Sequence, residues 1–214
     1  MYFDGSDVGL SVQVDDFDIV STNTILLSFF NDVTLPGIGS VGDNDIVQFT
    51  ATSLGSNTAG TFSLYFDGED VGLEKNPENI NAFDLLPDGR LLISTTGHTS
   101  VPGIKGAQDE DILVFTPTSL GTNTAGTWAL YFDGSDVGMR TTIDALGVGS
   151  NGDLYISTNS TSTINAVISE NEDVFICTPI TLGGNTSCYI HPDLYFDGSV
   201  WNLANDALDG IAVP

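Results

Sequence analysis

Short runs of alternating hydrophobic and polar residues cover this chain, and glycine-rich turns separate them. Residues 80–86 and 90–95 are two such runs, joined by a Pro-Asp-Gly turn in which glycine accepts a positive φ. Residues 109–116 and 127–132 are two more, joined by a polar turn. Because no stretch shows a helical period, the pattern predicts four antiparallel strands and an all-β fold.

The same four strands are expected twice more. In the first part of the chain they lie near residues 17–20, 24–30, 45–50 and 61–66. In the last part they lie near residues 143–148, 153–158, 173–178 and 189–196.

A nine-residue phrase, Tyr-Phe-Asp-Gly-Ser-Asp-Val-Gly-Leu in its first copy, marks the repeat. It begins at Tyr2, Tyr65, Tyr131 and, in weaker form, Tyr195, so the copies start 63, 66 and 64 residues apart. The segments 49–72 and 115–138 agree at 19 of 24 positions, which indicates a copied module. We therefore expect a single repeat domain, 1–214, with units near 11–73, 74–139 and 140–203, an outer strand of a preceding unit at 1–10 and the first strand of a following unit at 204–214.

Tandem four-stranded meanders are typical of the blades of a β-propeller. The sequence thus predicts a β-propeller-like array of three four-stranded antiparallel blades of about 64 residues, with unmatched terminal strands. A β-solenoid or a string of small sandwiches is the alternative, although a solenoid has a shorter repeat and a sandwich needs more strands in each core.

Two motifs carry a family resemblance. The motif Ala-Phe-Asp-x-x-Pro-Asp-Gly-x-Leu-x-Ile-Ser at 82–94, found in part at 143–157, resembles the two innermost strands of bacterial propeller repeats. The nine-residue phrase resembles repeats of uncharacterised secreted bacterial proteins. The resemblance implies a fold and no activity, and the period of this chain exceeds the roughly 40 to 50 residues of common blades.

Three complete units are fewer than the roughly four to eight blades that close a propeller. Unpaired strand edges template association, so we expect partners. These partners are either the rest of a longer repeat array or other copies of the chain, assembled as a ring or a filament.

The charge excludes one class of partner. The chain has 4 Lys and Arg against 29 Asp and Glu, a formal charge of -25, so it lacks the basic groups that neutralise phosphates in nucleic acids. Its longest apolar stretch, 25–30, is too short to cross a bilayer, so no direct membrane insertion is expected.

Acidic residues gather in the loops between strands two and three and between strands four and one, which should share one face. Clustered carboxylates suit Ca²⁺, which takes about six to eight oxygen ligands. The candidate ligands are Asp7, Asp70, Asp136, Asp43, Asp45, Asp109, Asp111 and Asp173. The alternative role is structural: the aspartate before each phrase glycine makes an Asx-turn that caps the end of strand four, at Asp4, Asp67, Asp133 and Asp197. The tight turns are expected on the opposite face.

Catalytic chemistry has little support. The two histidines, His98 and His191, lie in different units, and no nucleophile elbow or phosphate loop occurs. Carboxylate-pair catalysis stays open through Asp18, Asp84 and Asp209 on the innermost strands, with a hydrogen-bonding ring as the alternative role.

Cys177 and Cys188 flank a predicted turn, so they form either a disulfide across a hairpin or two buried thiols. A disulfide suits an extracellular or cell-surface protein. The sequence as a whole favours an extracellular structural or binding module that self-associates and binds Ca²⁺. A carboxylate- and divalent-ion-dependent propeller hydrolase or lyase is the alternative.

Overall fold

The computed structural model describes residues 1–74, 78–204 and 206–213, and in these segments the chain is all-β. The described strands form three four-stranded antiparallel sheets and two short hairpins. The first sheet has the order β1 (Val14–Ser21), β2 (Thr24–Phe29), β5 (Ile46–Ser53), β6 (Ala59–Phe66). The second has the order β7 (Ile80–Leu85), β8 (Leu91–Thr95), β9 (Ile112–Ser119), β10 (Ala125–Phe132). The third has the order β11 (Ile143–Val148), β12 (Leu154–Thr158), β15 (Phe175–Thr181), β16 (Ser187–Ile190).

The four-stranded antiparallel sheets predicted from the sequence are confirmed. The long loop between the second and third strands carries a hairpin in two sheets, β3 (Val33–Leu35) with β4 (Gly39–Val41), and β13 (Ser162–Ile164) with β14 (Val167–Ser169). In the second sheet a bridge between Thr99 and Ala107 takes this place. These hairpins account for much of the long repeat.

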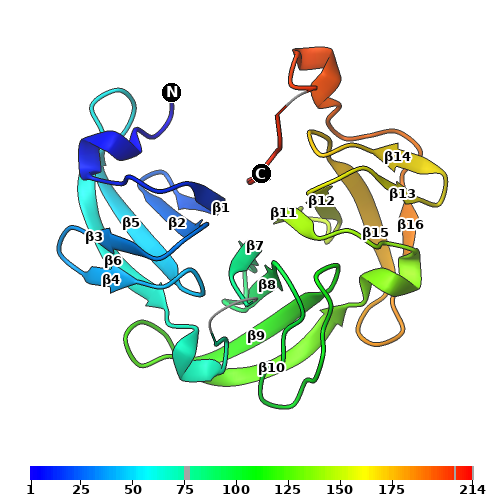
Figure 1. The fold of residues 1–214 in the computed structure, drawn as a ribbon, viewed down its shortest axis with the longest axis horizontal. Helices are drawn as coiled ribbons and strands as arrows, with labels where there is room; N and C mark the ends of the chain where they lie inside the picture. The colour runs from blue at the N-terminus through cyan, green and yellow to red at the C-terminus, as the bar shows by residue number, and fades with distance from the viewer. Residues whose placement is uncertain (75–77, 205, 214) are drawn as a thin grey trace.

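The sheets are arranged around a common centre, with β1, β7 and β11 nearest to it and β6, β10 and β16 outermost (Figure 1). Strand β7 contacts both β1 and β11. Apolar side chains fill the space between neighbouring sheets: Phe66 and Ile80 belong to a cluster shared by the first and second sheets, and Leu92 and Ile143 to one shared by the second and third. Burial of this apolar area is the main stabilising term of the fold.

The strand expected at 189–196 is wrong in its extent. Strand β16 ends at Ile190, two residues before Pro192, because proline lacks the N–H that a ladder needs. Pairing resumes at Phe196, which bridges Val174.

The two terminal segments are not strands either. Residues 1–4 are irregular and continue into a 3-10 helix, η1 (Gly5–Val8), while 206–213 form no ladder; Asn205, in the expected final strand, lies outside the described residues. Neither segment pairs with a strand of the described residues, and without such pairing no ladder forms. Their affiliation with further units stays a prediction.

The C-terminal segment nevertheless occupies the place of a first strand. Leu208 N donates to Asn171 O at 3.0 Å, as Ile80 N does to Asp43 O and Ile143 N to Asp109 O. In Figure 1 the segment reaches the centre between β1 and β11. Four segments thus meet there, with aligned sequences Val-Asp-Asp-Phe-Asp-Ile (14–19), Ile-Asn-Ala-Phe-Asp-Leu (80–85), Ile-Asp-Ala-Leu-Gly-Val (143–148) and Leu-Asp-Gly-Ile-Ala-Val (208–213).

Close packing confirms that the C-terminal segment touches both neighbours. A Cβ added to Gly210 would lie 2.8 Å from Asp16 Oδ1, and one added to Gly147 would lie 3.0 Å from Val213 Cγ2. Gln13 Nε2 also donates to Asp209 Oδ2 at 3.0 Å. Residues 206–213 therefore connect the third sheet to the first within one chain. No helix in the described part of the chain is long and apolar enough to cross a membrane.

Candidate functional site: carboxylates at the sheet junctions and the centre

The second aspartate of each phrase, proposed from sequence as a Ca²⁺ ligand, joins one unit to the next. Its carboxylate accepts the backbone N–H of a threonine in the turn between the last two strands of the following sheet. The pairs are Asp7 with Thr58 (2.9 Å), Asp70 with Thr124 (2.9 Å) and Asp136 with Thr186 (2.8 Å). In return, each threonine Oγ1 accepts the backbone N–H of the first aspartate of the phrase, Asp4, Asp67 or Asp133, at 2.9 Å.

This pairing, which we call the junction clamp, corrects one expectation. The phrase and the tight turns were expected on opposite faces, but the turn of one unit contacts the phrase of the preceding unit. Sheet twist explains this, because it rotates the outer strands away from the direction of the inner ones.

The aspartates at the start of the third strands bind the phrase that ends their own unit. Oδ1 of each accepts the backbone N–H of the phrase glycine at 3.0 Å, and Oδ2 accepts a backbone N–H three residues earlier. The triplets are Asp45 with Gly68 and Gly42, Asp111 with Gly134 and Gln108, and Asp173 with Gly198 and Glu170. Burial raises the pKa of Asp45 to about 6 and also raises that of Asp111, although these N–H groups oppose the shift.

The remaining two predicted ligands lie beside the centre. Asp109 Oδ2 accepts from Thr142 Oγ1 at 2.6 Å, and the backbone N–H of Asp43 donates to Asp32 Oδ1 at 3.2 Å. Among the described residues no three His, Cys, Asp or Glu side chains are grouped as metal ligands. Six of the eight predicted ligands thus lie at the junctions and bind backbone N–H groups, and the other two lie beside the centre.

A second set of carboxylates lines the centre. Asp16 is fully buried, and its Oδ2 accepts Phe83 N at 2.8 Å from the neighbouring β7. The backbone of Val148 likewise hydrogen-bonds Asp84, and that of Leu85 hydrogen-bonds Asp18. These contacts support the hydrogen-bonding ring, in which a carboxylate of one inner strand binds the backbone of the next.

Burial leaves these groups poorly solvated. It raises the pKa of Asp84 to about 8, with the charge of Asp18 adding to the effect, and it raises the pKa of Asp16 well above its usual value. Burial also raises the pKa of Asp15 to about 7, and the charges of Asp144 and Asp209 contribute.

The sequence grouping of Asp18, Asp84 and Asp209 is only partly right. Asp18 and Asp84 occupy the same position of adjacent inner strands and interact. Asp209 instead occupies the position equivalent to Asp15 and Asp144, and its charge contributes to the raised pKa values of both. Sequence reasoning missed Asp15, Asp16 and Asp144, and the alignment of 208–213 with the three inner strands would have found two of them.

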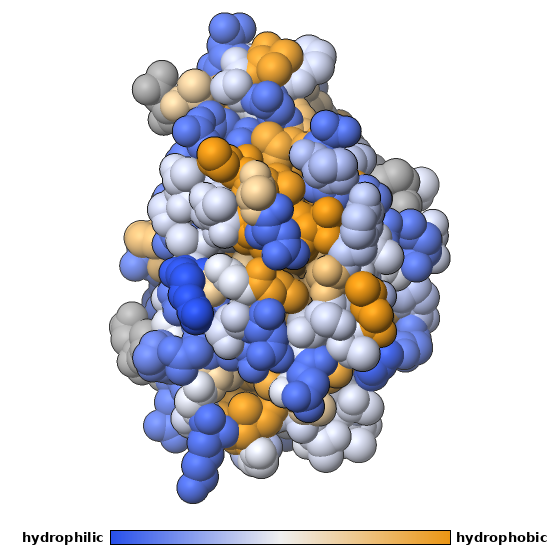
Figure 2. All heavy atoms as spheres, turned by 90° about the vertical axis from the view of Figure 1, so that its right-hand side faces the viewer, coloured by the Kyte–Doolittle hydropathy of each residue, from blue (hydrophilic) through white to orange (hydrophobic). Residues whose placement is uncertain are grey.

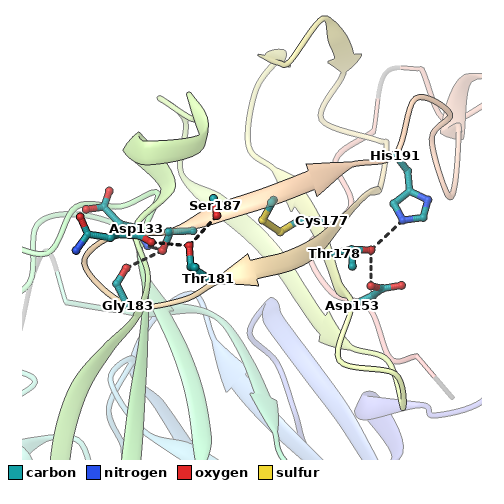
Figure 3. The surroundings of a disulfide bond; sticks show 11 residues. Asp133, Asp153, Cys177, Thr178, Thr181, Gly183, Ser187 and His191 are labelled. Carbon is teal, nitrogen blue, oxygen red and sulfur yellow. Dashed lines mark hydrogen bonds between the residues drawn. A yellow bond between two sulfur atoms is a disulfide. The ribbon is translucent and has the colours of Figure 1, made fainter.

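Unit three departs from the repeat at its disulfide. Cys177 and Cys188 are bonded, with Cα atoms 5.5 Å apart, in the outer pair of strands (Figure 3). The equivalent residues in unit one are Phe49 and Gly60, and a Cβ at Gly60 would lie 2.5 Å from the Phe49 ring. A disulfide therefore replaces an aromatic ring packed on a glycine.

In the third sheet His191 contacts the hydroxyl of Thr178, which is the histidine–hydroxyl contact found among the described residues. Thr178 Oγ1 donates to Asp153 Oδ1 at 2.5 Å and lies 3.0 Å from His191 Nε2 (Figure 3). Because the single hydroxyl proton goes to Asp153, His191 donates to Thr178 and does not act as its base. This arrangement gives no activated nucleophile.

Comparison with known proteins yields no match to a family model, a curated protein or a solved structure.

Proposed function

We propose that the chain is an extracellular or cell-surface β-propeller-like module with a structural or binding role, and that it associates with other copies of itself. The radial arrangement of the three sheets supports the propeller-like architecture (Figure 1). The disulfide suits an oxidising compartment. Association with the rest of a longer repeat array is the other outcome that the experiments below can return.

One observation carries self-association: among the described residues, the C-terminal segment 206–213 lies at the centre like the first strands but is paired in no ladder. An apolar groove runs along this segment, lined by Phe17, Val174, Tyr195 and Phe196 as well as by residues 208 and 210–213. In each complete unit a second strand covers the equivalent backbone. An uncovered strand position beside an apolar groove favours a β-rich partner.

The last copy of the phrase points the same way. Val200 stands where the earlier copies have the clamp aspartate, and Trp201 stands where they have valine. Val200 is 70% exposed and Trp201 68% exposed. The loss of the carboxylate removes the acceptor for another threonine turn, so an apolar contact is favoured in its place.

The third sheet adds apolar surface to this end. Figure 2 shows hydrophobic patches among polar side chains on the side of the molecule that this sheet forms. The exposed apolar side chains of unit three are Ile168, Ile180, Leu182, Tyr189, Tyr195, Val200, Trp201 and Leu203. Patches of this kind are typical of interaction surfaces. A second copy is the occupant we favour. Because each copy has a formal charge of -25, electrostatic repulsion opposes association, and the attraction between copies has to come from apolar contact.

Sedimentation velocity over a range of concentrations tests this proposal. We expect association of the wild-type chain that weakens in Trp201→Ser. The control is Phe30→Ser, which removes an apolar side chain that is 51% exposed in the first sheet, and it should associate like the wild type. A compact wild-type monomer at all concentrations would refute self-association.

Calcium binding on the acidic face is a further part of the proposal. Its support is the density of carboxylates, and the backbone bonds of the clamp aspartates compete with it. Asp70→Asn should weaken calcium binding if this face is the site, as measured by titration calorimetry.

A hydrolase or lyase is the second candidate function. It is favoured by a shallow pocket in which Asp18 lies beside Leu85 and Pro87, close to the high-pKa carboxyl of Asp84. Glycoside cleavage uses two neighbouring carboxyl groups, one of which has a raised pKa, and burial raises the pKa of both Asp84 and Asp18 here. Loss of glycosidase or lyase activity in Asp18→Asn, measured on a panel of polysaccharides, tests this alternative.

A further inference from the structure

The second residues of the four central segments form one level of polar side chains. They are Asp15 on β1, Asn81 on β7, Asp144 on β11 and Asp209 on the C-terminal segment. Asn81 Nδ2 donates to Asp144 Oδ1 at 2.9 Å and to Ile143 O at 2.7 Å. Asp209 Oδ2 accepts from Gln13. These bonds occupy one oxygen each of Asp144 and Asp209 and leave the second oxygen for another ligand.

Asp15 differs from its equivalents. It is 5% exposed, and its Oδ2 has no hydrogen-bond partner among the described residues. Where Asn81 donates its amide to the carbonyl of the next inner strand, a carboxylate has no proton to donate. A buried, unpartnered oxygen of this kind costs free energy unless something fills its place.

The charged groups that act on Asp15 are all negative, and the Asn79 side chain is its neutral hydrogen-bonding partner. The charges of Asp144, Asp209 and Asp43 all act on Asp15. No basic side chain among the described residues contributes to the pKa of Asp15, and Arg90 is paired with Asp88 at the surface. Like charges at close range repel, so the cluster is stable only with a counter-charge.

We propose that a divalent cation of the Ca²⁺ class binds at the centre between Asp15, Asp144 and Asp209. The ligands are all oxygen atoms and include no thiolate or imidazole, which suits a hard cation. The Asn81 side-chain carbonyl and water complete the coordination. Asp209 lies on a segment outside any ladder, so the carboxylates can converge when the ion binds. This site is separate from the acidic face and does not depend on self-association.

The test uses the full chain after exhaustive treatment with EDTA, with CaCl₂ added back. We expect wild type to bind one tight Ca²⁺ by titration calorimetry and to melt about 5 to 10 °C higher at a hundredfold excess over the dissociation constant. Asp15→Asn and Asp144→Asn should each weaken binding at least tenfold. The matched control is Asp88→Asn, which neutralises an exposed carboxylate beyond the other end of β7 from Asn81 and should bind Ca²⁺ like the wild type.

Several results would overturn the central site. One is a wild-type melting temperature that Ca²⁺ leaves unchanged, which would indicate that a proton on Asp15 supplies the missing charge. Another is an Asp15→Asn variant that binds Ca²⁺ like the wild type. Loss of binding in Asp70→Asn but not in Asp15→Asn would place the ion on the acidic face. Sedimentation of the same samples reports self-association independently.

Discussion

Replacing Asp84 by asparagine should stabilise the protein in alkaline solution and leave it nearly unchanged in acid. Asp84 is 8% exposed, and burial, followed by the charge of Asp18, raises its pKa to about 8. Asparagine has nearly the same shape and keeps an oxygen that can accept the backbone N–H of Val148. The substitution therefore removes the buried charge and little else.

The magnitude follows from the difference between the folded and unfolded pKa values. Asp84 rises from 3.8 to about 8, and each unit is worth about 1.4 kcal/mol, so the ionised group costs up to about 6 kcal/mol. Relaxation of the site reduces this, and we expect about 3 kcal/mol or more. Below pH 3.8 the carboxyl is protonated in both states and no difference arises. Between pH 3.8 and 8 the unfolded chain releases this proton first, so wild-type stability falls as the pH rises.

The assay is urea unfolding in EDTA-containing buffer at several pH values from 4 to 9. We expect the difference in free energy of unfolding between Asp84→Asn and wild type to grow with pH up to about pH 8 and then level off. The control, Asp88→Asn, changes an exposed carboxyl paired with Arg90 and should show no such growth. A difference that is independent of pH, or that favours wild type at pH 9, would refute the reasoning.

Three further predictions concern the connections between units. Asp70→Ala should lower the free energy of unfolding by about 1 to 2 kcal/mol and Asp70→Asn by less, since asparagine keeps an acceptor for the Thr124 N–H; denaturant unfolding measures both. Cys177→Ser should lower the free energy of unfolding by about 2 to 3 kcal/mol, because the disulfide no longer constrains the loop. The double variant Cys177→Phe, Cys188→Gly should recover part of this stability, because units one and two have phenylalanine and glycine at these positions. Equal stability of the single and the double variant would contradict this reasoning. Removing residues 206–214 should cost at least about 2 kcal/mol and increase hydrogen exchange in β1, whereas unchanged exchange there would show that the segment does not hold the first sheet.

The strands were predictable because their signals are local. Residues 80–95 show two runs of hydrophobic residues on either side of a Pro-Asp-Gly turn. The observed ends of β7 and β8 differ from the predicted ends by no more than one residue. The repeat then carried the same assignment to the other units. It failed where a local feature breaks the copy, as at Pro192, which ends pairing before the predicted strand is complete.

The functional residues were harder to predict because their roles depend on contacts between units. Asp70 looks like a metal ligand in sequence, since a carboxylate next to other carboxylates has the same appearance whether it binds an ion or a backbone amide. Only the position of the Thr124 turn, 54 residues away, distinguishes the two roles. Asp15 was missed for a related reason, since its neighbours Asp144 and Asp209 come from distant segments.

Repetition itself separates structural acidic residues from those with another role. The clamp aspartates and those at the start of the third strands recur in every complete unit, and each recurrence makes the same backbone hydrogen bonds. A contact that every junction needs must repeat. The central level does not repeat in the same way, because it has aspartate in three segments and asparagine in one. Within this level, Asp15 has a buried oxygen without a hydrogen-bond partner among the described residues. The nine-residue phrase behaves likewise: its first three copies clamp a following turn, and its fourth replaces the clamp aspartate with Val200 beside an exposed tryptophan. The places where the copies differ are therefore where we propose binding, of an ion at the centre and of an apolar partner at the end of the third unit.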